Sequence, residues 1–464
     1  MTGRVGRGAF IAAIAATMLA GACGGDSGGD AAAGEEATGG TAGGGASAES
    51  LLDGEIACDQ QHAGKEVTIF SPTRDSDTDK PVADFVAAYQ PLVDCTGVKI
   101  VWEGTDQFET EIKVRIDGGN APDVIDFPQP GLLASLAKKG QIPEVPANIA
   151  KHTNEDFIAG WAELSTVDGK VYGLPARANV KSLVWYSPAA FAEGGYEIPE
   201  TLDELTDLSD KIVADGGTPW CAGIESGVAT GWPVTDWFED MMLRINGPEV
   251  YDQWVNHEIP FDDAKVKAAA DAVGSFLKNP DYLGGENAVK AIATTKFQEG
   301  GFPILDGSCF MHRQASFYSG LWPEGTEIGP DGAVDFFYLP VAKAGDDKVM
   351  LGAGDIYTAG QDKPEAWDVL LYTGSLEYAQ AVLESRKEIS PRKDIDPSTI
   401  SDPLTKRFQE LLVSSDVFRF DGSDMMPGAV GAGTFWTEVT AWIVGGDTDT
   451  MLENIEASWP ASTD

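Results

Sequence analysis

Short β-branched runs alternate with amphipathic segments over residues 67–127, and this alternation constrains the fold more than any other feature. Strand-like runs lie at 67–71, 98–102 and 124–127, and segments with apolar residues at helical spacing lie at 79–94 and 106–116. Glycines follow both helical segments as stop signals. Consecutive strand–helix–strand units predict a parallel sheet with right-handed crossovers. We therefore expect the folded body to open with an α/β domain.

The pattern changes near residue 172, where a Gly/Pro turn precedes a further strand-like run at 182–186. From there to residue 340 the chain is predicted to be helix-rich, with amphipathic candidates at 202–213 and 266–277. A Gly-rich strand is predicted at 351–358, and mainly helix from there to Trp459. A body of about 400 residues exceeds what one hydrophobic core usually serves, so we expect two domains.

The N-terminus has the organisation of an export signal. Arg4 and Arg7 precede an apolar run at 9–20, and the small residues 21 and 22 precede Cys23. The apolar run is too short to span a bilayer as a mature helix, so residues 1–22 are predicted to be a signal peptide. A Cys at the expected cleavage point resembles a bacterial lipoprotein signal, in which Cys23 carries the lipid. An ordinary signal peptide with an incidental Cys is the alternative.

Residues 23–62 are predicted to be a lipidated Cys followed by a flexible linker, because Gly, Ala, Ser, Thr and acidic residues dominate residues 24–50. The predicted location is the outer face of the cell membrane, or the periplasm if the organism has an outer membrane. Chemistry driven by ATP or NAD is not expected there.

The chain is strongly acidic. Lys and Arg total 32 against 74 Asp and Glu, which gives a formal net charge of −42. Such a charge repels phosphate backbones, so nucleic acid is not an expected partner. The acidity is compatible with a cationic ligand such as a polyamine, although carboxylates spread over a whole chain more often serve surface solubility.

Four cysteines remain once Cys23 is set aside: Cys58, Cys95, Cys221 and Cys309. An even number in an oxidising compartment predicts disulfides, and four cysteines allow three pairings. Their order favours Cys58 with Cys95 and Cys221 with Cys309, each closing a long loop. Four buried free thiols are the alternative.

Catalytic patterns are scarce. The four histidines have no metal-ligand spacing, and the chain has neither a phosphate-binding Gly loop ending in Lys-Ser/Thr nor a Gly-x-Ser-x-Gly elbow. Asp75, Asp77 and Asp79 alternate as in a calcium loop, but Lys80 and Val86 stand where Gly and Glu are required. We therefore predict no enzyme activity, cofactor or metal. A carboxylate pair for glycoside hydrolysis stays open among the many acids.

Tryptophan is more informative. The chain has 12, and several stand beside polar residues in Gly/Pro-rich segments. Sugars present C–H faces to aromatic rings and vicinal hydroxyls to carboxylates, amides and guanidinium groups. Thr230, Trp232 and Asp236 offer both kinds of group within one short segment. Core packing is the alternative role for each Trp taken alone.

Four ordered segments resemble those of extracellular solute-binding proteins of carbohydrate ABC transporters, especially the alpha-glucoside-binding branch and, more distantly, maltodextrin-binding protein. They are residues 122–133 (PDVIDFPQPGLL), 172–175 (YGLP), 181–186 (KSLVWY) and 351–355 (LGAGD). The resemblance covers nearly the whole mature chain.

That resemblance implies an α/β, two-lobed fold of the periplasmic-binding-protein type II, with the ligand cleft between lobes joined by a multi-crossing hinge. Lobe 1 is expected at 63–175 and 350–392, and lobe 2 at 178–348 and 396–464. The chain is expected to cross between lobes near 172–178, 340–351 and 391–396.

The ligand site is predicted from the expected sheet and from the family resemblance. Arg74 and Asp75 follow the first strand, and open α/β sheets bind ligands at strand carboxyl ends. The resemblance adds Gln129 in lobe 1, where the distant relative has an acid. It further adds Thr230, Trp232, Asp236, Arg313, Gln314 and Phe317 in lobe 2, Gly354 and Asp355 on the returning strand, Arg392 at the hinge, and Phe435 and Trp436 as a stacking face.

The predicted function is therefore a lipid-anchored, monomeric receptor that captures an oligosaccharide by cleft closure and passes it to an ABC permease. An alpha-glucoside disaccharide is the expected ligand. A polyamine receptor and a secreted glycoside hydrolase are the alternatives.

Overall fold

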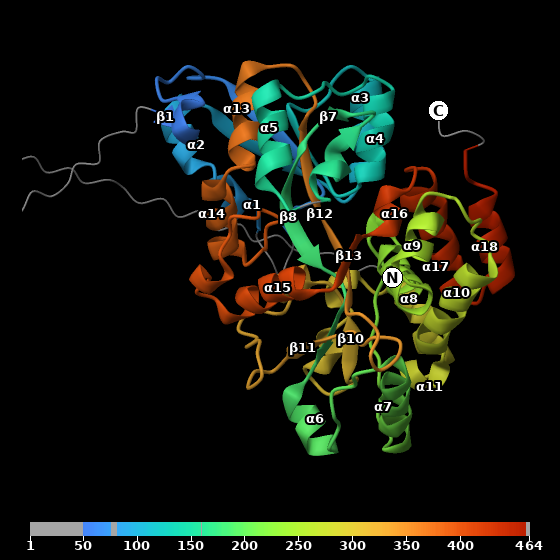
Figure 1. The fold of residues 1–464 in the computed structure, drawn as a ribbon. Helices are drawn as coiled ribbons and strands as arrows, with labels where there is room; N and C mark the ends of the chain where they lie inside the picture. Colours follow the sequence, from blue (N-terminus) through green and yellow to red (C-terminus); the bar gives the residue numbers. More distant parts are fainter. Residues whose placement is uncertain (1–49, 76–80, 159, 461–464) are drawn as a thin grey trace, which may run out of the picture. The chain divides into compact units, whose positions relative to one another are not determined.

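A six-stranded sheet organises the first part of the computed structural model, which describes residues 50–75, 81–158 and 160–460 (Figure 1). Its parallel strands are β3 (Glu66–Ser71), β4 (Lys99–Gly104) and β5 (Val124–Phe127). The predicted parallel α/β unit is thus confirmed. β12 (Val349–Ala359) joins β5 in antiparallel register, so a strand from much later in the chain extends this sheet.

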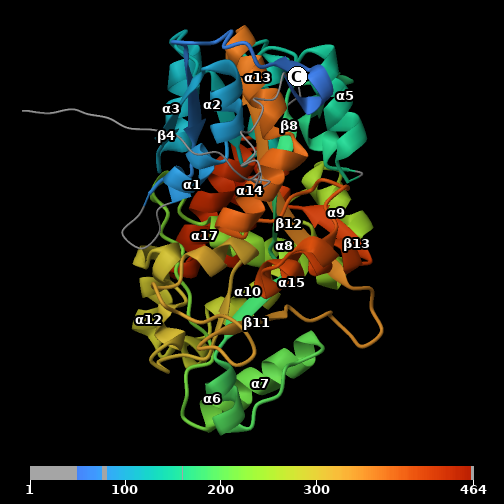
Figure 2. The same cartoon turned by 90° about the vertical axis from the view of Figure 1, so that its left-hand side faces the viewer.

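Strand β12 connects the sheet to distant segments. It pairs antiparallel with β8 (Leu174–Val180) along one edge, and parallel with β13 (Val417–Phe420) near its beginning. Figures 1 and 2 show β8 and β12 running together from the group of helices that contains α13 toward α8. The predicted strand at 351–358 is confirmed and is longer than expected.

The predicted helix at 79–94 forms two helices, α1 (Pro81–Ala87) and α2 (Gln90–Thr96). Pro91 lies in the first turn of α2, where its missing N–H costs nothing, so a new helix begins there. The other helices around this sheet are α3 (Phe108–Asp117), α4 (Pro130–Lys138), α5 (Ala147–Asp156), α13 (Pro364–Thr373) and α14 (Leu376–Arg386).

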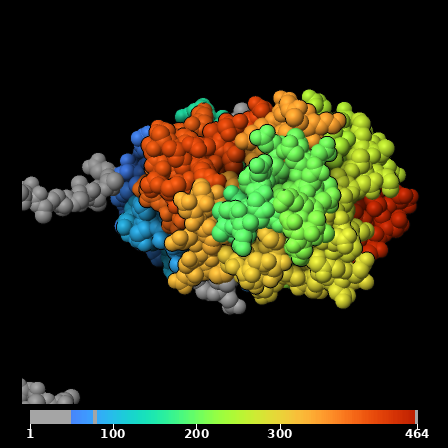
Figure 3. All heavy atoms as spheres, turned by 90° about the horizontal axis from the view of Figure 1, so that it is seen from below, coloured from blue at the N-terminus to red at the C-terminus, as the bar shows by residue number. Residues whose placement is uncertain are grey.

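The second part contains a three-stranded antiparallel sheet with β9 (Leu183–Tyr186) between β10 (Met311–Arg313) and β11 (Asp335–Tyr338). Phe191 of α6 (Pro188–Gly194) meets the Tyr186 ring edge-on at 4.6 Å. α6 and α7 (Leu202–Ala214) lie at the centre of the face shown in Figure 3.

Further helices complete this part, as its helix-rich sequence predicts. They are α8 (Trp232–Asn246), α9 (Pro248–Val255), α10 (Ala264–Leu277), α11 (Pro280–Leu283), α12 (Glu286–Ala291), α15 (Pro403–Ser414), α16 (Gly422–Met425), α17 (Trp436–Ile443) and α18 (Thr448–Glu456). A π-helical turn, η9 (Val430–Phe435), leads directly into α17.

Buried apolar side chains form two cores. One gathers Ile69, Phe127 and Tyr357 of the large sheet with its helices, and extends to Trp185. The other gathers Trp254 and Phe435 with the buried faces of α8, α10 and α17.

Residues 50–62 differ from the predicted linker, which extends to residue 62. They form the short strands β1 (Ser50–Leu51) and β2 (Ile56–Ala57), and Ile56 is buried in the first core. Cys58 is bonded to Cys95, which fixes this segment to α2. The second disulfide joins Cys221 to Cys309, so the structure contains both predicted pairs.

Two chain segments link the two sheets, and the predicted crossings near 172–178, 340–351 and 391–396 stay predictions. β8 of the large sheet leads into β9 of the small one, and β11 of the small sheet leads back to β12. The exact lobe boundaries stay a prediction. No helix in the described ranges is long and apolar enough to cross a membrane. The predicted signal peptide, the lipidated Cys23, most of the linker, and Asp77 and Asp79 lie outside the described residues.

Candidate ligand-binding site

A cavity of about 740 Å³ lies at the carboxyl ends of the parallel strands. Thr73 and Arg74 follow β3, Thr105 follows β4, and Gln129 follows β5. Segments of the second part form the opposite walls, including the beginning of α8, the loop around Phe297, and α16. The position agrees with the rule for open α/β sheets, and the volume falls within the roughly 300–1,000 Å³ typical of small-molecule sites.

One wall of the cavity is aromatic. The Trp232 ring lies 5.0 Å from the Phe297 ring at 71°, and 6.0 Å from the Phe317 ring. All three side chains are half-buried and line the cavity. Trp436, at the beginning of α17, is buried, and its indole N–H has no hydrogen-bond partner among the described residues. This wall offers ring faces suited to stacking against an apolar ligand surface.

The first-lobe wall is organised by Arg177 on β8. Its guanidinium lies 3.0 Å from carboxylate oxygens of Asp126, Asp355 and Glu388. Arg177, Asp126 and Asp355 are buried and Glu388 is half-buried, and Asp126 also accepts a 2.7 Å hydrogen bond from Ser71. Burial and the neighbouring Asp126 raise the pKa of Asp355 to about 7, although Arg177 opposes this rise.

The opposite wall rests on Lys181, four residues later. Its ammonium lies 2.9 Å from Asp236 and also binds Asp421. Burial alone would raise the pKa of Asp421, but Lys181 outweighs it and the pKa is lowered. The ammonium is 5.4 Å from the centre of the Trp232 ring, so this network lies directly behind the aromatic wall.

Three buried carboxyls of this second network, Asp236, Glu239 and Asp421, are close enough to share a metal ion. Two of them bind Lys181, whose ammonium therefore supplies the positive charge that such a group requires. Arg313 adds a second cation, at 2.8 Å from Asp236 and 2.5 Å from Asp240. The donor set is that of an ion-pair network, which fixes α8 against β10.

Eight of the predicted site residues line the cavity. They are Arg74, Asp75, Gln129, Trp232, Phe317, Gly354, Asp355 and Trp436. Gly354 is a glycine for a steric reason, because a Cβ there would overlap the Arg177 carbonyl oxygen and the Trp161 ring. The fold therefore brings predicted site residues that are far apart in the sequence, from Arg74 to Trp436, to one cavity.

Six predicted residues lie outside the cavity lining. Asp236 and Arg313 form the ion pairs behind it, and the Gln314 side chain accepts a hydrogen bond from the Ala315 N–H. Thr230 stabilises the loop before α8 through a 2.7 Å hydrogen bond to Gly227. Phe435 packs edge-on against Phe238 and Trp254 in the second core, and Arg392 binds Asp394 at 2.6 Å.

The sequence argument missed several polar lining residues: Glu109, Arg177, Lys181, Glu388, Asp421 and Asp424. Arg177 and Lys181 carry a usable signal, since both are charged residues in or directly after a mainly apolar segment, residues 174–180, which forms the buried strand β8. The acidic lining residues carry no such signal, because nothing in the sequence distinguishes them from the many other acids of the chain.

The sequence matches the profile of the family described as "Bacterial extracellular solute-binding protein" over residues 79–370. The chain is a bacterial extracellular solute-binding protein. The family predicted from the ordered motifs is confirmed, and with it the prediction that the chain is a receptor and not an enzyme.

Two named relatives cover most of this solute-binding protein. It is 42% identical over 376 residues to the "Osmoprotective compounds-binding protein GgtB" of Synechocystis sp., covering 80% of this chain and 88% of the relative. It is 37% identical over 407 residues to the "Alpha-glucosides-binding periplasmic protein AglE" of Rhizobium meliloti, covering 85% and 87%.

Solved structures show the same fold. A structure titled "Chitin oligosaccharide binding protein" superposes with a TM-score of 0.71 at 20% identity, covering 84% of this chain and 97% of the other. The solute-binding protein thus has the predicted two-lobed type II fold, with its mixed α/β composition.

Proposed function

We propose that this solute-binding protein captures a neutral glycoside of about disaccharide size, in the first place an alpha-glucoside, and delivers it to the permease of an ABC importer. The observation that carries the proposal is the composition of the cavity, where an aromatic wall faces amide and carboxyl groups. Such a pairing suits a ligand with C–H faces and many hydroxyls. The name of the relative from Rhizobium meliloti supports the ligand class.

An osmoprotective glycoside is the second candidate. It is favoured by the 42% identity to the relative from Synechocystis, which is named for osmoprotective compounds. Both candidate ligands are uncharged and carry many hydroxyl groups, so the same cavity lining suits both. They differ in the group that is attached to the glucosyl ring. A polyamine is the contrasting candidate, favoured only by the excess of carboxyls among the lining residues.

The mode of action follows from the two lobes. Groups from both lobes contact one cavity, so a ligand that binds both at once stabilises the closed arrangement by its differential affinity. Closure then presents the loaded receptor to the permease. We further propose that Cys23 anchors the monomeric receptor by lipid to the outer membrane face, which raises its effective concentration near the permease.

The test is isothermal titration of the purified mature chain against alpha-linked disaccharides, their beta-linked isomers, a glucosylated polyol and spermidine. We expect saturable binding of an alpha-glucoside or the glucosylated polyol and none of spermidine. Binding of spermidine alone, with affinity that falls steeply as salt is added, would contradict the proposal.

The aromatic wall provides a matched pair of variants. Trp232→Ala removes a lining ring and should weaken sugar binding about 10- to 100-fold, equivalent to the loss of one stacked ring of roughly 1–3 kcal/mol. Trp367→Ala removes a half-buried Trp of α13 that does not line the cavity, and should leave affinity unchanged. Equal effects of the two changes would place the ligand elsewhere.

A further inference from the structure

Asp424 of α16 lines the cavity, yet nothing within the described ranges neutralises its side chain. It is 8% exposed, and no hydrogen bond or ion pair joins its carboxyl to another described residue. Every other buried acid of the two networks described above has a hydrogen-bonded partner, such as Arg177 for Asp355 or Lys181 for Asp421. Asp424 is therefore a buried polar group that is open to the ligand.

Acids surround Asp424. On its own element, the Asp421 carboxylate accepts a 3.0 Å hydrogen bond from the Asp424 backbone N–H. Behind it, Asp236 and Glu239 project from α8, and Glu239 accepts a 2.9 Å bond from the Ser423 N–H. The nearest cation, Lys181, is already shared between Asp236 and Asp421.

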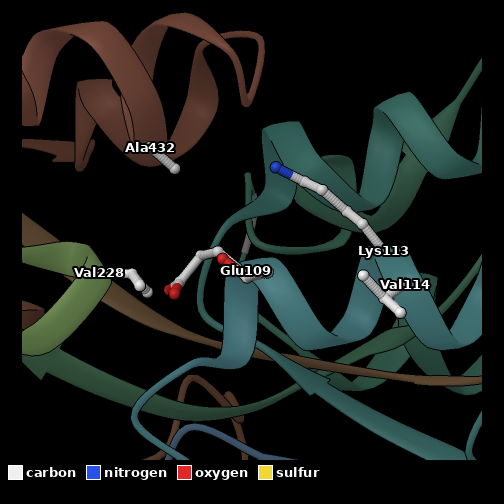
Figure 4. Close-up of a pocket in the computed structure, with 6 residues that line it drawn as sticks. Glu109, Lys113, Val114, Val228 and Ala432 are labelled. Atoms are coloured by element: carbon white, nitrogen blue, oxygen red, sulfur yellow. The ribbon is translucent and has the colours of Figure 1, made fainter.

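A further acid approaches from the other lobe. Glu109 of α3 lines both the main cavity and a smaller one of about 310 Å³, where Figure 4 shows it extending from α3 toward Val228. Its carboxyl accepts a 3.0 Å hydrogen bond from Gln129, and Lys113 is the cation nearest to it on α3. The charge of Glu109 thus reaches Asp424 from the α3 side of the cavity.

A buried carboxylate without a counter-ion is costly, and such a group takes up a proton instead. Burial, followed by the charge of Asp421, raises the pKa of Asp424 well above its ordinary value, with Asp236 and Glu109 adding to the rise and Lys181 opposing it. A neutral carboxylic acid can donate as well as accept hydrogen bonds, whereas a carboxylate only accepts.

We infer that Asp424 is a specificity-determining residue that binds the ligand as an uncharged carboxylic acid, donating one hydrogen bond to a ligand oxygen and accepting another from a ligand hydroxyl. This inference rests on the proposed function and names the ligand group involved: an ether or hydroxyl oxygen beside a second hydroxyl, as a glycoside presents. A cationic ligand would instead require the ionised form.

The binding experiment compares wild type with Asp424→Asn, Asp424→Ala and the control Asp215→Asn, using the sugar from the titration panel between pH 6 and pH 9. Asp424→Asn keeps a neutral donor and acceptor, so its affinity should stay within about threefold of wild type at pH 6. Asp424→Ala should bind roughly tenfold more weakly. Asp215 is exposed, pairs with Lys211 and does not line the cavity, so its change should have little effect.

The pH profile separates this role from a structural one. Wild-type affinity should fall as the pH rises and Asp424 ionises, whereas Asp424→Asn should lose less affinity over the same range. Asparagine binding as weakly as alanine at pH 6 would overturn the inference, because it would show that the ligand needs the carboxylate.

A ligand-free measurement keeps the inference testable if no sugar binds. Carbon-13 NMR of the aspartate carboxyls, with the Asp424 resonance assigned by its loss in Asp424→Asn, should show a protonated carboxyl at pH 6. A resonance that titrates near pH 4 would overturn the inference whether or not a sugar binds. A wild-type protein that binds no sugar overturns the proposed function, and the resonance still decides the state of Asp424.

Discussion

Arg177 and Lys181 lie four residues apart on one segment of the chain, and each is the centre of a different buried network. Arg177 meets three carboxylates supplied by β5, β12 and the segment after α14. Lys181 meets carboxylates of α8 and of the residue that caps α16. One crossing segment therefore carries a cation to each wall of the cavity, and each cation fixes that wall to its own lobe.

The two networks respond differently to protons. Around Arg177, the pKa of Asp355 is raised by burial to about 7, so a proton is exchanged near neutral pH. Around Lys181, burial and neighbouring acids hold the pKa of Glu239 well above its usual range, while Lys181 keeps that of Asp421 below it. The two networks titrate differently because Arg177 is shared among three carboxylates, whereas Lys181 binds two and the nearby Glu239 forms no ion pair among the described residues.

The largest expected effect is that of Lys181→Met. It leaves Asp236 and Asp421 buried without this cation, and breaking a buried ion pair on one side typically costs about 3–5 kcal/mol. Thermal and urea unfolding should show that loss. Lys211→Met, which removes an exposed pair with Asp215, is the matched control and should change stability little. A loss no greater than the control would show that the network does not stabilise the fold.

Arg177→Met should also destabilise the protein, by about 3–5 kcal/mol at pH 8, but less at pH 5. A carboxyl whose folded pKa is raised contributes stability that is present at low pH and is lost as the pH rises through that pKa. Without Arg177, protonation of Asp355 relieves the repulsion, so the deficit shrinks on acidification. Urea unfolding of wild type and Arg177→Met at pH 5 and pH 8 measures this difference in stability. A deficit independent of pH would remove the distinction drawn between the networks.

The smallest effect should be that of Arg74→Ala at the cavity mouth. Arg74 is exposed and pairs with Asp106 at 3.1 Å, and exposed ion pairs contribute less than about 1 kcal/mol. Its melting temperature should match that of wild type closely, in contrast to the two buried cations. A loss comparable with that of Arg177→Met would show that burial is not what separates these groups.

Local patterns predicted much of the fold. The strands at 67–71 and 124–127 and the helices at 202–213 and 266–277 coincide with β3, β5, α7 and α10 within a few residues. Such elements follow from apolar periodicity and capping residues, which are local. The split between α1 and α2 was missed because the apolar spacing continues across Pro91 and conceals the break.

The ligand site was predicted less completely than the fold, because only some of its residues have a local sequence signal. Gln129, Trp232 and Gly354 belong to motifs or stand beside aromatic runs, so their role has a local signal. Asp424 and Glu109 do not, since each is one acid among 74. Phe435 was expected to face the ligand beside Trp436, but neighbours on a helix point in different directions, and Phe435 packs into the core instead.

By itself, the sequence determined the order of strands and helices, the even set of cysteines and the family, because these depend on residues that are close in the chain or on motifs in a fixed order. Only the tertiary structure decided which charges meet. Lys181 and Asp421 are 240 residues apart, and Arg177 and Glu388 are 211 apart. Ion pairing at such separations depends on how β8, β12 and α16 pack, and burial then sets which carboxyls keep their protons.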